Sequence, residues 1–106
     1  MNILSLLADF AAGIFLCNCI PHLAAGLRGE LFPSPFASPP GIGNSHPIAN
    51  VFWGTSNAVV GLLLLSYAPV SIGLNLPFLS AVSGAYIGGS FVALHFDRVR
   101  KSRENH

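Results

Sequence analysis

The chain has 106 residues, and only 8% of them are charged, against roughly 25% in an ordinary soluble domain. Five basic and four acidic residues give a net charge of +1, and no formal charge occurs between Glu30 and Asp97. This composition excludes most soluble folds, and the absence of a broad basic surface excludes nucleic acid as a partner. We expect residues 1–106 to form one membrane domain with the lipid bilayer around it.

Three apolar segments are long enough to cross a bilayer, whose hydrocarbon core of about 30 Å needs about 20 apolar residues. They cover about residues 3–27, 50–68 and 76–96. The predicted fold class is therefore all-α, an integral membrane three-helix bundle. Pro21 lies inside the first segment and is expected to bend or end that helix, because proline removes a backbone hydrogen bond.

A proline-rich loop, residues 28–49, separates the first two segments. Five prolines exclude a helix over most of this stretch. Its aromatic and aliphatic residues and its lack of charge beyond Glu30 are not typical of disorder. We expect an ordered loop that lies among lipid headgroups or folds back over the helices.

The basic residues predict the orientation of the chain. All five lie beside the loop at 28–49 or in the tail at 97–106, and lysine and arginine mark the cytoplasmic side. We expect a multi-pass protein of the cell inner membrane. The loop and the C-terminus face the cytoplasm, and the connection at 69–75 faces outward.

Small residues recur along one face of each segment and predict close helix packing. Glycines dominate these faces in the second and third segments, and Gly84 and Gly88 form a GxxxG element. Such faces pack a bundle or join copies in a homo-oligomer, because small side chains let helix backbones approach closely. The predicted packing positions are Gly54, Gly61, Gly84 and Gly88.

Polar residues in or beside the apolar segments are candidates for a ligand site or a transport pathway, because each is unfavourable in lipid unless it has a partner. A structural role is the alternative for each of them, through hydrogen bonds between helices or hydration at the interface. Asp9 could carry protons, pair with a partner subunit or stay hydrated near the outer surface. The candidates are Asp9, Asn18, His22, His46, Asn57 and His95.

Metal and enzyme chemistry have weaker support. His22, His46 and His95 are all placed toward the cytoplasmic side and could form a metal site, a haem pair or a proton relay. No HxxxH or CxxC spacing supports this, and Cys17 and Cys19 point to different faces of a helix. No nucleophile has a visible base, so we predict no catalytic residues, no resident metal and no cofactor.

Four short motifs resemble a group of small bacterial inner-membrane proteins without an assigned activity. They are NxxPH at 18–22, GxxG at 26–29, FPSPF at 32–36 and NVxWGxxN at 50–57. The resemblance covers roughly residues 18 to 61. It implies a bacterial origin and a membrane location, and it implies no activity.

The sequence favours a role as an oligomeric or accessory subunit of a larger membrane complex, with the proline-rich loop as its specific contact. A homo-oligomeric carrier or channel, lined by the intramembrane polar residues, is the alternative. A metal- or haem-binding membrane protein that uses the three histidines is a third reading.

Overall fold

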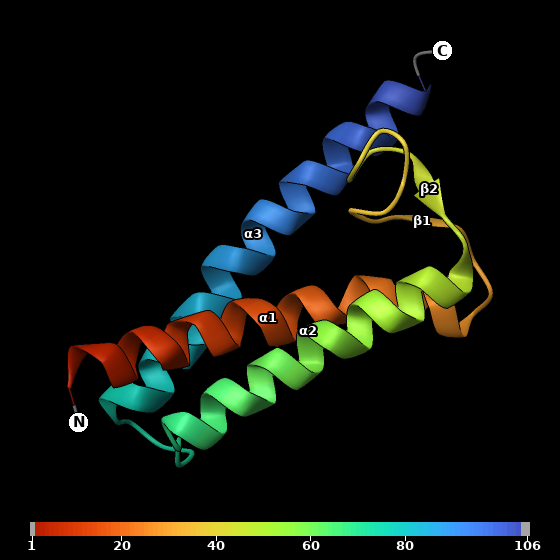
Figure 1. The fold of residues 1–106 in the computed structure, drawn as a ribbon. Helices are drawn as coiled ribbons and strands as arrows, with labels where there is room; N and C mark the ends of the chain where they lie inside the picture. Colours follow the sequence, from red (N-terminus) through yellow and green to blue (C-terminus); the bar gives the residue numbers. More distant parts are fainter. Residues whose placement is uncertain (1, 105–106) are drawn as a thin grey trace.

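The computed structural model describes residues 2–104 and is mostly helical (Figure 1). Its helices are α1 (Ile3–Leu27), α2 (Pro47–Tyr67) and α3 (Leu76–Glu104). Two short strands, β1 (Phe32–Pro33) and β2 (Asn44–Ser45), lie between α1 and α2. The predicted three-helix fold is confirmed, and each helix is long and apolar enough to cross a membrane.

Two helices extend beyond their predicted segments. Helix α2 begins at Pro47, before the expected start at Asn50, because proline suits the first helical position and His46 caps the helix. The His46 Nδ1 atom accepts a hydrogen bond from the Ile48 backbone N–H at 3.1 Å. Helix α3 continues past Phe96 through the charged tail. Ion pairs from Asp97 to Lys101 and Arg100 support this last part.

Pro21 does not end α1, which continues to Leu27. The residues after Pro21 are held by tertiary contacts that the sequence alone does not show. His22 and Ala25 are buried, and Gly26 lies so close to α2 that an added Cβ would approach the Pro47 carbonyl oxygen to 2.7 Å. Packing against a neighbouring helix therefore maintains the turn that proline weakens.

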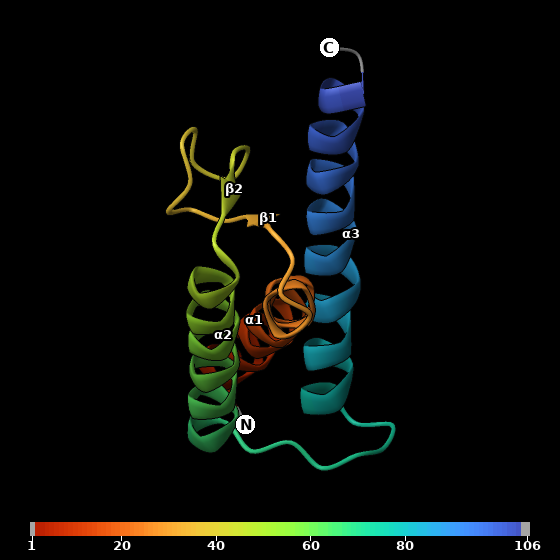
Figure 2. The same ribbon diagram turned by 90° about the vertical axis from the view of Figure 1, so that its right-hand side faces the viewer.

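Helix α1 is the centre of the molecule. It packs against both α2 and α3, which make few contacts with each other (Figure 2). The backbones approach closely at glycines: an added Cβ at Gly54 would lie 2.8 Å from the Leu23 amide nitrogen, and one at Gly84 would meet the Phe10 carbonyl oxygen. The glycine faces of α2 and α3 are thus occupied by α1 of the same chain.

The proline-rich loop has a defined conformation and folds back over the helix ends. Strands β1 and β2 pair antiparallel, with Phe32 opposite Ser45. This loop and the C-terminal end of α3 lie at one end of the molecule, and the N-terminus and the α2–α3 connection lie at the other (Figure 1). Where the chain leaves α1, the Arg28 guanidinium hydrogen-bonds Glu30 at 2.7 Å and lowers the pKa of that carboxyl group.

Candidate functional site

Two asparagines join α1 to α2 within the bundle. The Asn18 amide donates a hydrogen bond to Asn57 Oδ1 at 3.0 Å, and the Asn57 amide donates to the Trp53 carbonyl at 2.8 Å. Asn57 is buried. Its amide oxygen and nitrogen are both used within the chain, so this pair acts as a polar connection between helices.

His22 and Asn50 form a second connection one helical turn closer to the loop. The His22 Nδ1 atom lies 2.9 Å from Asn50 Oδ1, and the Asn50 amide donates to the Phe32 carbonyl at 2.9 Å. Both side chains are almost fully buried, with His22 2% exposed and Asn50 0% exposed. Asn50 therefore links α1, α2 and the start of β1 through one side chain.

Three aromatic rings surround the His22 imidazole. The ring centroids of Phe32, Phe96 and Trp53 lie 5.5, 5.8 and 6.4 Å from that of His22, each in an edge-to-face arrangement. These rings come from β1, α3 and α2. The imidazole consequently has a fixed position and orientation between the three helices and the loop.

The loop is attached to α3 by polar contacts. His95 Nε2 lies 2.7 Å from the Gly41 carbonyl oxygen, and Arg103 donates to Asn44 Oδ1 at 2.9 Å and also to the Ile42 carbonyl. Gly41 has a φ of 72°, a conformation that glycine adopts without strain. Within the loop, the Ser34 and Ser45 hydroxyl oxygens are 2.6 Å apart.

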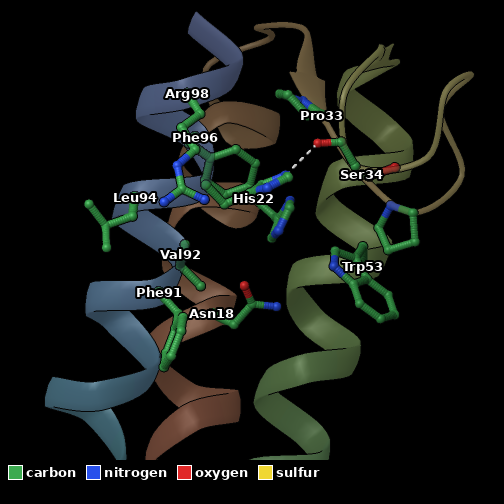
Figure 3. A pocket seen from close by; sticks show the side chains of 13 residues that line it. Asn18, His22, Pro33, Ser34, Trp53, Phe91, Val92, Leu94, Phe96 and Arg98 are labelled. Carbon is green, nitrogen blue, oxygen red and sulfur yellow. Dashed lines mark hydrogen bonds between the residues drawn. The ribbon is translucent and has the colours of Figure 1, made fainter.

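A cavity of about 530 Å³ lies where these elements meet, and we call it the loop-end cavity. Figure 3 shows Asn18 and His22 of α1 between the side chains from α3 and Trp53 of α2. The walls are mostly apolar and aromatic, and the polar groups come from α1, the loop and α3. The lining residues are Asn18, His22, Pro33, Ser34, Pro35, Gly41, Trp53, Phe91, Val92, Leu94, His95, Phe96 and Arg98.

One nitrogen of His22 has no hydrogen-bond partner among residues 2–104. Nδ1 contacts Asn50, whereas Nε2 makes no bond to any described residue, although the side chain is 2% exposed and lines the cavity. Arg98, also at the cavity, makes no ion pair with a described residue. The cavity therefore offers one imidazole nitrogen and one cationic side chain to a bound molecule.

The remaining candidates lie elsewhere. His46 is exposed and caps α2. Asp9 lies about 13 Å from Asn18 along α1 and does not line the loop-end cavity. Asp9 is 1% exposed, and neither carboxylate oxygen has a hydrogen-bond partner among the described residues. This burial does not fit the alternative in which Asp9 stays hydrated near the outer surface.

The three histidines do not gather into one site. His22 contacts Asn50, His46 contacts the Ile48 backbone, and His95 contacts the Gly41 carbonyl. Within residues 2–104, no group of three His, Cys, Asp or Glu side chains is arranged to hold a metal ion. His22 and His95 both line the loop-end cavity and both pack against Phe96.

Two residues at this end of the molecule were not among the sequence candidates: Trp53, which lines the cavity, and Asn50, which bonds His22 beside it. Trp53 is typical of an interfacial anchor, and Asn50 belongs to the glycine face of α2. The sequence does contain a signal for them. Asn50, Trp53 and Asn57 follow one another at spacings of three and four residues, so they share one helix face. Nothing in the sequence showed that the loop and α3 form a cavity together with that face.

Comparisons with protein-family models, with curated proteins and with solved structures found no match. The resemblance to small bacterial inner-membrane proteins therefore stays a prediction. The function proposed below rests on the geometry of the chain itself.

Proposed function

We propose that this chain is a multi-pass membrane protein that binds a small, mostly apolar molecule in the loop-end cavity. The observation that carries this proposal is the buried His22 imidazole, which lines the cavity and has one nitrogen without a partner. A mostly apolar cavity with a few convergent polar groups is typical of a small-molecule site. The protein would act as a binding protein rather than as an enzyme.

The rim of the cavity favours a molecule that arrives from the membrane. Phe91 and Leu94 line the cavity and are at the same time largely exposed on α3. In a bilayer, this outer face of α3 would lie against lipid. A membrane-soluble molecule could therefore reach the cavity along α3 without crossing the polar loop.

Filling the cavity tests this proposal. Val92 lines the cavity, so Val92→Phe should displace the bound molecule, whereas Val60→Phe on an exposed part of α2 should not. Trp53 is the only tryptophan of the chain and lines the cavity, so its fluorescence reports occupancy. We expect solvent extracts of the wild type and of Val60→Phe to contain a bound compound that Val92→Phe lacks.

The same preparations show whether the binding proposal fails. The three proteins are isolated in native lipid particles, extracted and compared by mass spectrometry, and the Trp53 emission is recorded before and after extraction. Equal extracts from all three proteins, with an unchanged Trp53 emission, would contradict a binding role for the cavity.

A transport pathway has less support from the same geometry. Asn18 and Asn57 hydrogen-bond each other, and His22 bonds to Asn50, so these groups connect α1 and α2. The subunit role also stays a prediction. Because α1 fills the glycine faces of α2 and α3, contacts between copies would need other surfaces.

A further inference from the structure

We propose that His22 Nε2 accepts a hydrogen bond from the hydroxyl group of a phenolic, membrane-soluble ligand, and that Asn50 is the positioning residue that fixes this role. This inference rests on the proposed binding function and names the class of molecule. It follows from the hydrogen bonds of Asn50, which leave one protonation pattern for the neutral imidazole.

The orientation of the Asn50 amide is determined by its neighbours. Its Nδ2 atom lies 2.9 Å from the Phe32 carbonyl oxygen and 3.4 Å from the carbonyl oxygens of Ser45 and His46. A carbonyl oxygen only accepts hydrogen bonds, so the amide NH₂ must face these three groups. The amide oxygen Oδ1 consequently faces His22.

The same reasoning fixes the tautomer of His22. Because Asn50 Oδ1 only accepts, the His22 Nδ1 atom at 2.9 Å must carry the hydrogen. In a neutral imidazole the other nitrogen, Nε2, then has a lone pair and no hydrogen. The cavity therefore presents an acceptor on a nearly buried side chain, which a hydroxyl group can satisfy and an ether or a ketone cannot.

The walls favour an aromatic body for this hydroxyl-bearing ligand. Trp53 and Phe96 are arranged edge-to-face with the His22 ring, and Phe91 lies further along α3. The Trp53 indole N–H makes no hydrogen bond to another described residue and can donate to the ligand oxygen. A phenol can pack its ring against these side chains while its hydroxyl donates to Nε2 and accepts from Trp53.

A matched ligand pair tests the inference on the full chain in lipid nanodiscs. Para-butylanisole carries a methyl group in place of the hydroxyl hydrogen that Nε2 would accept from para-butylphenol. Binding is followed by Trp53 fluorescence, with empty nanodiscs to correct for partition into lipid. We expect the phenol to bind at least about tenfold more tightly, because the ether would cover Nε2 without donating a hydrogen bond to it.

Nitrogen NMR of isotope-labelled histidine gives an independent readout. We expect His22 to show the Nδ1–H tautomer, and its Nε2 resonance to shift with the phenol and not with the anisole. The His22 signal is identified by its loss in His22→Phe. An Nε2–H tautomer, or equal affinity for the two compounds, would overturn the inference.

Two variants separate a binding role from a structural one. His22→Phe keeps a ring among Phe32, Trp53 and Phe96 but removes the acceptor, so the preference for the phenol should disappear. Asn57 does not line the cavity and bonds neither His22 nor Asn50, so the preference should remain in Asn57→Ala although its bond to Asn18 is lost. If neither compound perturbs wild-type Trp53, or if both do so equally, the phenol inference fails. The binding function itself fails only if the extracts of the wild type and of Val92→Phe are also equal.

Discussion

Asn50 joins three elements of this protein through one side chain. It is completely buried and connects the imidazole of α1 to the carbonyl group of Phe32. These bonds fix the orientation of α1, α2 and β1 relative to one another. The position of the loop over the helix ends therefore depends on this residue.

Asn50→Ala should destabilise the fold by about 2–4 kcal/mol, because it leaves two buried polar groups without partners. Equilibrium unfolding in micelles measures this change. The control is Asn57→Ala, which also removes the hydrogen bonds of one buried asparagine and should cost only about 0.6–1.7 kcal/mol. Equal losses in the two variants would contradict the special role of Asn50.

Asp9 represents the opposite case, a buried polar side chain without a partner among residues 2–104. Asp9→Leu keeps the branched shape and the number of side-chain heavy atoms, and it removes the unsatisfied group. We expect it to raise the free energy of unfolding by about 1–3 kcal/mol. Asn18→Leu, which breaks a bond to Asn57, should lower it. A destabilised Asp9→Leu protein would show that the carboxyl group has a partner in the membrane.

At the scale of the elements, close approach of backbones decides how the helices pack. Helices α2 and α3 contact α1 through glycines, and van der Waals packing is the main attraction between helices in lipid. The contact is tightest where a Cβ would meet backbone atoms of the partner. A side-chain neighbour can move aside, whereas a backbone neighbour requires the helices to separate.

Gly84→Ala should therefore disrupt the α1–α3 contact, because its Cβ would meet the Phe10 carbonyl group. Gly89→Ala is the matched control, since its Cβ would meet only the Cys17 thiol at 2.9 Å, which can rotate. We expect a loss of about 1–3 kcal/mol for Gly84→Ala and a small change for Gly89→Ala. The same unfolding assay compares them, and comparable values would contradict the proposed packing.

At the scale of the whole molecule, the helices divide the protein into two ends with different composition. The proline-rich loop and all the basic side chains lie at one end, and the 69–75 connection lies at the other. In a bilayer this asymmetry predicts that the loop end faces the cytoplasm. The loop-end cavity would then lie toward the cytoplasmic side of the membrane.

Labelling of introduced cysteines tests this orientation. Ser71 and Ser38 are exposed at opposite ends of the molecule. A membrane-impermeant thiol reagent added outside intact cells should modify Ser71→Cys and not Ser38→Cys, and inverted vesicles should give the reverse. The unaltered chain, with Cys17 and Cys19, measures the background. Outside labelling of Ser38→Cys would overturn the orientation.

The sequence by itself determined the three apolar helices and the faces along which their small residues lie. Those features depend on local composition and on the helical period, both of which can be read from neighbouring positions. The sequence could not decide whether Pro21 bends or ends α1, and it placed the end of α3 too early, at Phe96, because packing and ion pairs beyond the apolar run decide these points.

Only the tertiary structure decided what the polar residues do. Asn18 and His22 share a face of α1, yet one bonds Asn57 and the other bonds Asn50 beside a cavity. Their partners lie 39 and 28 residues away, on another helix. The fold alone sets that register, because a rotation of α2 by one residue would exchange or remove every one of these contacts.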